Sequence, residues 1–527
     1  MLWILISLIC MAVTYLYVIK PHKYWKSVGV KQGNPTIFFG DSWGMVSRKQ
    51  SFTEMVLYLY NMFPNTRYSG FYQFLKPTLI LRDPDLIKQM AVKDFDHFMD
   101  HRPLVPVESD NIFGKNLVSL RGQKWKDMRA TVSPSFTSSK MKMMFGLISE
   151  CANDFVDHFK QNSNQDVTTI EMKDIFTRFT NDVIATAVFG IEINSLKDKD
   201  NEFYVMGRNM TNFSGFWKGI KFLGFFAFPK LFKLLNIKMF SEDEYSFFKS
   251  IIVETIKTRE EKGILRSDLI QILMEARKGL HKYEDGKSGD IDTGFATVEE
   301  SEIGKTKKDI SLTDDDVTAQ ALVFFFAGFE TVSSLMCFMC YELAVNQDVQ
   351  DRLREEIQQT LKDCGAKLTY EALMKMKYMD MVVSESLRKW PNAPGTDRIC
   401  TKPYTIEPVL PDEKPIHLKI DDVIFLPFFG LHRDPQYYPD PDKFDPERFN
   451  DENKGNIKPY TYLPFGVGPR SCIGSRFAIM ETKAVYFHLL ANFKIIPVKE
   501  SVIPLKICRK SFNLTSENGF WFGLQKL

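Results

Sequence analysis

The sequence has almost no net charge and no segment with the composition of a linker. Its 68 lysines and arginines nearly balance 66 aspartates and glutamates, leaving +2 at neutral pH, which gives no reason to expect a nucleic acid as partner. Beyond about residue 40, no stretch rich in proline, glycine and serine and no internal repeat divides the chain. Because a hydrophobic share of 44% can fill a large core, we predict one large domain rather than several.

Cysteine is scarce and scattered, and no complete nucleotide-binding loop is present. Cys337 and Cys340, two of the eight cysteines, form a single CxxC inside an apolar helical pattern, so we interpret them as core residues. This usage favours a reducing compartment. The stretch "DGKSG" resembles part of a phosphate-binding loop, but His281 occupies the position of its first glycine. With no nucleotide or flavin fingerprint in the chain, electrons for any redox chemistry must come from another protein.

A long uncharged run stands at the N-terminus. Residues 2–19, "LWILISLICMAVTYLYVI", are just long enough to span a bilayer. No basic residue precedes the run, whereas Lys20, Lys23 and Lys26 follow it, which places the rest of the chain in the cytosol. A cleaved signal peptide is the alternative, but the run lacks its basic start and its small-x-small cleavage site. We predict a membrane anchor over 1–20, a linker over 21–45 and a folded domain over 46–527.

Helical patterns dominate from about residue 84 to about residue 390, with one polar interruption. Residues 278–309 have little apolar periodicity and favour a mobile surface loop. Thr313 is then a suitable N-cap, three aspartates suit the positive first turn, and no proline follows before Asn346. A helix of about 33 residues would be about 50 Å long. Its middle is apolar all round, so we predict that it runs through the centre of the protein.

This long helix carries "AGFET", Ala327 to Thr331. A glutamate and a hydroxyl beside two very small residues are costly in a buried helix unless they have partners or a task. The alternative is a kink in which the Thr331 hydroxyl bonds back to a carbonyl of the preceding turn. From the residues alone, both interpretations stay open.

Near the C-terminus, "PFGVGPRSCIG", Pro464 to Gly474, surrounds one cysteine with turn-forming residues. Cys472 could be a core residue, half of a disulfide, a nucleophile or a metal ligand. A cytosolic chain disfavours the disulfide, and no His–Asp constellation supports a nucleophile.

A third motif is "ESLR" in a predicted helix. Its Glu385 and Arg388 stand at i and i+3, so they share one face and can pair. Arg448, in a proline-rich coil downstream, is a candidate third member.

These motifs occur together and in order, and the chain resembles the cytochrome P450 family of haem-thiolate monooxygenases. "FGVGPRSCIG" matches the family's cysteine loop, "AGFET" its oxygen-activation motif, "ESLR" its E-x-x-R helix, "PERF" its meander and "WKDMR" its haem-facing helix. The likeness covers nearly the whole chain after the anchor. "FDHFMDHRP" and "SPSFTSSKMK" are similar to the insect branch that metabolises xenobiotics and insecticides. The resemblance implies a mainly α fold with small β-sheets, a single large domain and a haem b cofactor.

The resemblance also implies how the haem is held. Cys472 would be the axial thiolate ligand of the iron, and Phe465 would shield its sulfur. Gly466 and Gly474 would let backbone amides approach that sulfur. The haem propionates would be bound by Trp125, Arg129, Arg398 and Arg470. His101 stands where some relatives place an arginine, and the proline-rich hinge of the family is reduced to "KQGNP".

The remaining roles follow from the same resemblance. Ala327 and Gly328 would leave room for dioxygen, and Glu330 and Thr331 would deliver protons. A structural brace would join Glu385, Arg388 and Arg448. The substrate cavity would be lined by Val105, Val107, Ile112, Phe113, Phe324, Phe325 and Phe512, each of which could equally be a core residue.

The implied surroundings are the endoplasmic reticulum membrane and an NADPH-dependent reductase, and the family also admits cytochrome b5 as a donor. Lys124 and Lys126 are candidate docking charges. Residues 213–235 combine many aromatics with four lysines, which suits a surface that dips into the bilayer; two ordinary packed helices are the alternative.

Other functions remain open at this stage. They are a haem-thiolate isomerase or dehydratase acting on peroxides, a membrane-anchored haem sensor or carrier, and a monooxygenase of hormone, pheromone or fatty-acid metabolism. An intact Glu330–Thr331 pair argues against the first two.

Overall fold

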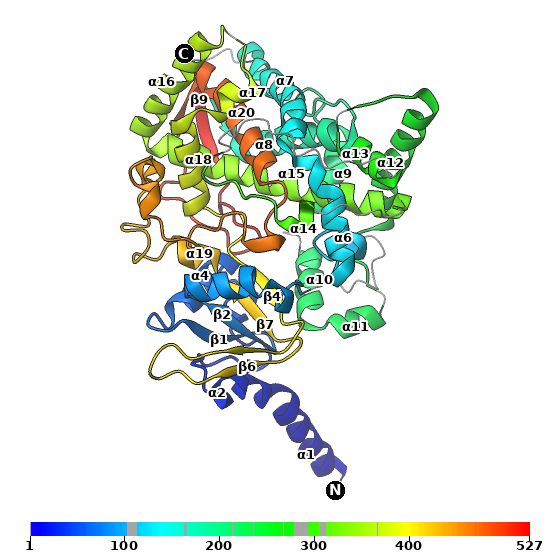
Figure 1. Ribbon diagram of the computed structural model, residues 1–527, viewed down its shortest axis with the longest axis vertical. Helices are drawn as coiled ribbons and strands as arrows, with labels where there is room; N and C mark the ends of the chain where they lie inside the picture. Colours follow the sequence, from blue (N-terminus) through cyan, green and yellow to red (C-terminus); the bar gives the residue numbers. More distant parts are fainter. Residues whose placement is uncertain are drawn as a thin grey trace.

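Helices form the body of the computed structural model, small sheets lie beside them, and one helix projects from the body (Figure 1). The structure describes residues 2–102, 113–162, 166–212, 216–235, 237–266, 268–278, 294–305, 312–365 and 367–527. The predicted fold class, mainly α with small β-sheets, is confirmed.

The described α-helices fall into three groups along the chain. The first group is α1 (Leu2–Thr14), α2 (Tyr24–Ser27), α3 (Trp43–Val46), α4 (Phe52–Asn61), α5 (Pro84–Lys88), α6 (Gly122–Val132) and α7 (Ser138–Asn162). The second is α8 (Met172–Ile184), α9 (Glu202–Thr211), α10 (Phe216–Ala227), α11 (Pro229–Leu234), α12 (Glu242–Lys262), α13 (Leu269–Arg277) and α14 (Glu302–Lys305). The third is α15 (Asp314–Val345), α16 (Gln347–Asp363), α17 (Tyr370–Met374), α18 (Lys377–Lys389), α19 (Phe428–His432) and α20 (Ser475–Asn492).

The strands pair into small sheets that join distant parts of the chain. A four-stranded sheet has the order β1 (Tyr68–Gln73), β2 (Lys76–Leu81), β7 (Val423–Leu426) and β4 (Thr396–Ile399). A second sheet has the order β3 (Val167–Glu171), β9 (Trp521–Lys526) and β8 (Phe493–Pro497), and a third pairs β5 (Tyr404–Ile406) with β6 (Ile416–Leu418). All pairs are antiparallel except β2 with β7, and β7 joins β4 to the N-terminal strands β1 and β2.

The long central helix predicted from the sequence is confirmed as α15. Thr313 caps it through a capping box with Asp316, and its three leading aspartates lie at the positive end of the helix. Within the described residues, α15 is also the one helix with the length and hydropathy to cross a membrane, but most of it is buried inside the protein. It is therefore the core helix around which the other helices pack.

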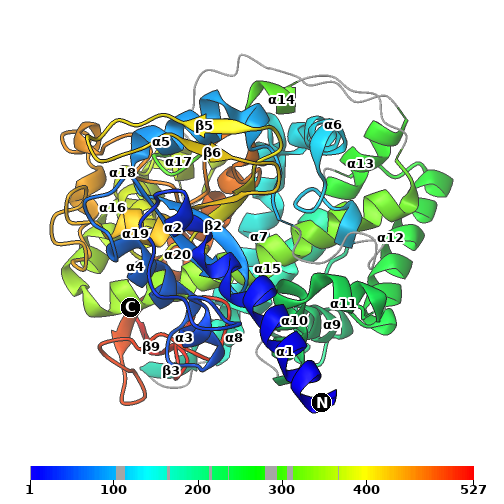
Figure 2. The same ribbon diagram turned by 90° about the horizontal axis from the view of Figure 1, so that it is seen from below.

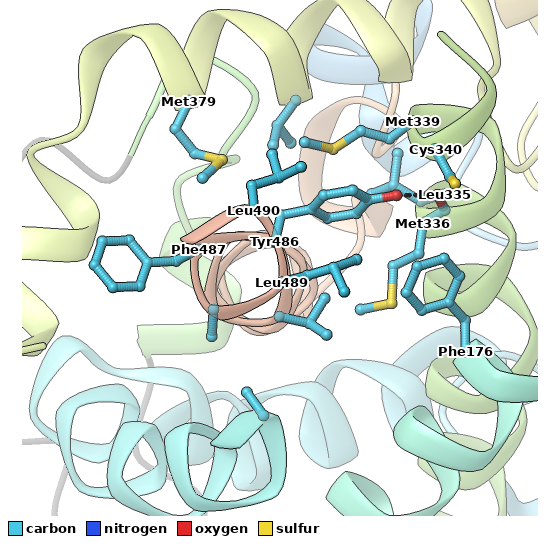
Figure 3. Packing of buried hydrophobic residues seen from close by; sticks show 14 of the residues in the cluster. Phe176, Leu335, Met336, Met339, Cys340, Met379, Tyr486, Phe487, Leu489 and Leu490 are labelled. Carbon is cyan, nitrogen blue, oxygen red and sulfur yellow. Dashed lines mark hydrogen bonds between the residues drawn. The ribbon is translucent and has the colours of Figure 1, made fainter. Parts of the chain in front are cut away.

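Figure 3 shows part of the core between α15, α18, α20 and α8. The ring of Tyr486 on α20 lies among methionine and leucine side chains, and its hydroxyl donates to the carbonyl of Met336 on α15. This bond satisfies the one polar atom of a fully buried tyrosine. α20 is thus fixed against α15 directly after the segment that carries Cys472.

The N-terminal segment leaves the body as α1, continues through a π-helical turn at Tyr15–Ile19, and then docks (Figures 1 and 2). The docking residue is Trp25, which is fully buried against β1 at Gly70. Residues 21–45, predicted as a linker, therefore begin with a segment packed on the four-stranded sheet. The anchor and the domain boundaries remain predictions.

The polar stretch 278–309 is described at residue 278 and over residues 294–305. That described part does not project from the surface as a free loop, because it packs against α6 and its end forms α14. Both views place α14 beside α6 (Figures 1 and 2).

Candidate haem site

A cavity of about 450 Å³ lies between the middle of α15 and the cysteine loop. Its lining combines apolar side chains with a few buried cations. The predicted site residues on it are Trp125, Arg129, Phe324, Ala327, Gly328, Thr331, Arg398, Phe465, Gly466, Arg470, Cys472 and Gly474. Elements more than 300 residues apart in the sequence thus share one site.

The cysteine loop is held by its own backbone. Gly466 and Gly468 have φ of +79° and +70°, a conformation that side-chain-bearing residues rarely adopt. The amide of Cys472 donates to the carbonyl of Phe465 (2.8 Å), which closes the turn. α20 begins at Ser475, so its positive end lies directly after the cysteine.

The thiol of Cys472 is open to the cavity and otherwise enclosed by protein. This enclosure raises the pKa of the thiol, while the Gly474 amide and the Arg129 guanidinium favour the thiolate and oppose the rise. A positively charged metal is the strongest available influence that would hold the sulfur ionised.

Three buried guanidiniums give the cavity a positive edge, those of Arg129, Arg398 and Arg470. Arg470 donates to the carbonyls of Met99 (2.8 Å) and Leu120 (2.8 Å) and stacks on the ring of Trp125. Burial, and the nearby Arg398, lower the pKa of Arg470 to about 9. Burial likewise lowers the pKa of Arg398 to about 10, and its buried Nε has no partner among the described residues.

His101 also lines the cavity. Its Nδ1 lies 3.2 Å from a carboxylate oxygen of Asp397 and 3.3 Å from Nη1 of Arg398. Burial and the charge of Arg398 lower the pKa of His101 to about 4, so it is neutral near pH 7.

These residues fit a flat apolar group that carries anions and needs a thiolate. The buried arginines are only partly compensated, by Asp100 on Arg470 and Glu300 on Arg129. Buried guanidiniums beside a cavity cost free energy unless an anion reaches them. A haem, with two carboxylates and an iron that takes one sulfur ligand, meets each of these demands.

On the opposite wall, Ala327 and Thr331 are the exposed positions of a stretch of α15 that is otherwise buried or half-buried. The Thr331 hydroxyl donates to the carbonyl of Ala327, as the kink interpretation proposed, yet α15 is unbroken there. Gly328 lines the cavity as well, and a methyl group there would press on Ile184 at 2.8 Å. The two sequence interpretations are therefore compatible.

Glu330 is turned toward α8. Its carboxylate forms an ion pair with Lys173 (3.0 Å), and that ammonium also donates to the hydroxyls of Ser333 and Ser334. The described lining of the cavity does not include Glu330.

The predicted brace is present behind the site. Arg388 donates from Nε and Nη2 to the two oxygens of Glu385 at 2.6 and 2.8 Å, and both side chains are fully buried. Nε of Arg448 lies 3.5 Å from the same carboxylate.

The predicted substrate-contacting residues are more widely spread than the sequence suggested. Phe324 lines the cavity, whereas Phe325 is buried among Phe189, Phe203 and Phe248. The described lining includes neither Phe113, which packs on Phe240 and Phe326, nor Phe512, which stacks on Phe52. Val105, Val107 and Ile112 lie outside the described residues.

Sequence reasoning missed several lining residues, among them Leu117, Phe136, Ile184, Val188 and Val323. Each is an ordinary hydrophobic residue in a helix or turn, so its pattern matches that of any core position. Phe136 lies within "SPSFTSSKMK", a stretch interpreted from the sequence only as a likeness to the insect branch.

A long buried helix that faces a cysteine loop across an arginine-edged cavity defines a haem-thiolate protein. The family model described as Cytochrome P450 matches residues 34–521, and the chain belongs to this family. It is 46% identical to cytochrome P450 9e2 of Blattella germanica, over all of this chain and 98% of that protein. Identity to probable cytochrome P450 9f2 of Drosophila melanogaster is 43% over 99% of both chains, and to cytochrome P450 6k1 of Blattella germanica 38% over 96% and 93%. The protein is thus a monooxygenase that uses haem with a cysteine thiolate ligand and NADPH electrons from a reductase.

Proposed function

We propose that the protein oxidises lipophilic xenobiotics, insecticides among them, at the endoplasmic reticulum membrane. The observation that carries the oxygenase site is the placement of Cys472 across one cavity from Ala327 and Thr331. The apolar side chains that dominate the lining favour a lipophilic substrate.

In this proposal Cys472 ligates the iron, and Phe465 shields its sulfur. Arg398 and Arg470, with Trp125 stacked on the latter, would bind the propionates, because both arginines line the cavity. Gly466 and Gly474 shape the loop. When bound, the haem activates dioxygen and transfers one oxygen atom to the substrate.

The distal side of the cavity would supply space and protons. The small residues Ala327 and Gly328 leave space beside α15 for dioxygen, and Thr331 lies at the cavity wall. Glu330 lies one residue away, held by Lys173. For Glu330 to pass protons toward Thr331, its carboxylate must leave this ion pair, or water must link the two side chains.

Membrane attachment is supported by exposed apolar surface in two places. The side chain of Trp3 on α1 is 81% exposed, and on α10 and α11 Trp217 is 74% and Leu234 81% exposed. α10 and α11 lie on the side of the body from which α1 projects (Figures 1 and 2). We propose that α1 anchors the chain and that α10 and α11 dip into the bilayer, where lipophilic substrates concentrate.

The first experiment is spectral. The reduced protein with carbon monoxide should show the red-shifted band of a thiolate-ligated haem, and Cys472→Ala should lose it. If Cys472→Ala keeps the band, another residue is the ligand.

The second experiment addresses the reaction. With purified reductase, the protein should consume NADPH and oxidise members of a panel of insecticides and plant toxins. Preferential oxidation of steroids or fatty acids in the same panel would assign it to endogenous metabolism instead. Product formation without NADPH would indicate a peroxide isomerase, and no turnover at all a haem carrier. Addition of cytochrome b5 tests that donor.

A further inference from the structure

Residues 294–305, here called the strap, lie across the protein beside the cysteine loop. At the start of the strap, the amide of Phe295 donates to the carboxylate of Asp380 on α18 (2.9 Å). The next side chain, Ala296, is buried in the main core cluster. The strap is therefore fixed to the core and does not simply lie on the surface.

In its middle the strap touches the start of α20. The amide of Val298 donates to the hydroxyl of Ser475 (3.3 Å), three residues after Cys472. From here the strap continues toward α6, where it ends as α14. No described residue of the strap lines the cavity, so it supports the cysteine loop from outside the haem pocket.

The strap brings one carboxylate, Glu300, onto Arg129 of α6. The Glu300 oxygens accept from Nε (3.1 Å) and Nη2 (2.6 Å) of a guanidinium that is 4% exposed. The amide of Ser301 donates to one of the same oxygens at 3.0 Å. Two parallel, charged hydrogen bonds fix the plane of the guanidinium as well as its position.

The remaining terminal nitrogen of Arg129 reaches the cysteine loop itself. Nη1 donates to the carbonyl of Ser471 at 2.9 Å, and Ser471 immediately precedes Cys472. A continuous chain of contacts thus runs from the strap, through Glu300 and Arg129, to the peptide that carries the sulfur.

We propose that Glu300 is a positioning residue of the haem site, which holds Arg129 against the Ser471 carbonyl and so fixes the loop that presents Cys472 to the iron. This inference rests on the proposed role of Cys472 as the ligand. The family resemblance gives Arg129 the task of binding a propionate, which its contact with the Ser471 carbonyl does not exclude.

The test uses the full-length, haem-loaded protein and records the ferrous carbon monoxide spectrum over time. Glu300→Gln removes the charge, Glu300→Asp shortens the side chain, and Glu299→Gln removes the same charge from the neighbouring exposed position. We expect Glu300→Gln to lose the thiolate-ligated form roughly tenfold faster than the parent, as for one lost charged hydrogen bond. Glu300→Asp should be intermediate, and Glu299→Gln should behave like the parent.

A double-mutant cycle with Arg129→Gln completes the test. If Glu300 acts through Arg129, adding Glu300→Gln to Arg129→Gln changes the loss rate little. Additive effects overturn the proposal, and so does a Glu300→Gln protein that keeps the thiolate form as long as the parent. The proposed ligand fails separately: a thiolate band that survives in Cys472→Ala refutes that assignment whatever the Glu300 variants do.

Discussion

Replacing Arg388 should destabilise this protein far more than a typical substitution, because its ion pair with Glu385 is cut off from water. Besides the two bonds to Glu385, the guanidinium donates to the carbonyls of His432 (2.8 Å) and Pro441 (2.8 Å). These bonds tie α18 to α19 and to the coil that follows it. The coil leads on to the cysteine loop, so the pair supports the haem site from behind.

The size of the effect follows from what Arg388→Ala leaves behind. Glu385 stays buried and keeps the amide of Asp445 (2.9 Å), with Arg448 as the nearest remaining cation at 3.5 Å. Removing one partner of a buried pair costs about 3–5 kcal/mol. Against a total stability of about 5–15 kcal/mol, such a loss would leave a protein that retains little haem. Arg388→Lys keeps the positive charge but loses the paired hydrogen bonds of the guanidinium, so it should reduce stability less than Arg388→Ala.

The measurement is urea unfolding followed by circular dichroism, together with the haem content of the purified protein. The double variant Glu385→Leu/Arg388→Met should recover part of the stability, because no uncompensated charge remains. If the free energy of unfolding of Arg388→Ala falls by less than about 1 kcal/mol, the reasoning is refuted, because a solvent-exposed ion pair contributes that much. A double variant less stable than Arg388→Ala would refute it too.

Three further predictions use other parts of the structure. Thr331→Ala should keep haem and the carbon monoxide band, while product per NADPH falls roughly tenfold and the missing electrons appear as hydrogen peroxide. Gly70→Ala should cost about 1–3 kcal/mol, measured by urea unfolding, because a methyl group there would overlap the indole of Trp25. Burial raises the pKa of Asp182 from 3.8 to about 6. The folded state therefore holds its proton more tightly, and this stabilisation is complete below pH 3.8 and disappears as the pH rises through 6. Asp182→Asn, which cannot titrate, should consequently cost about 2 kcal/mol more near pH 4 than near pH 7.5.

One result would contradict each of these three predictions. An unchanged product yield per NADPH would remove Thr331 from proton delivery. A Gly70→Ala protein as stable as the parent would mean that Trp25 has room to shift. A stability difference between Asp182→Asn and the parent that does not vary with pH would mean that Asp182 titrates normally.

Local sequence spacing was enough to place the parts of the site that depend on one element. The capped apolar run from Thr313 to Asn346 predicted α15, and the interval from Ala327 to Thr331 is one helical turn, so both residues face the cavity. The Glu385–Arg388 pair followed from the same rule. In each case a short stretch of chain and its periodicity determine the contact.

Contacts between distant segments could not be predicted in this way. Phe324 and Phe325 are adjacent and chemically identical, yet they point about 100° apart, one into the cavity and one into a cluster with α9 and α12. Which of the two lines the cavity depends on where α9 and α12 pack. That information is not contained in the composition of α15.

The polar stretch 278–309, which its sequence predicts to be a mobile surface loop, is likewise held by contacts with distant segments over its described residues 294–305. Its described part buries only isolated apolar residues such as Ala296, so it has no hydrophobic period to detect, and hydrogen bonds and the carboxylate of Glu300 also hold it. A charge in an unpatterned segment is normally solvated, and the sequence gives no sign that Arg129 lies opposite Glu300. Arg129 also contacts the Ser471 carbonyl. The strap, which has no recognisable sequence pattern, is therefore joined through the side chains of Glu300 and Arg129 to the loop that carries Cys472. Substitutions in such a segment can therefore alter the haem ligand loop without touching the cavity.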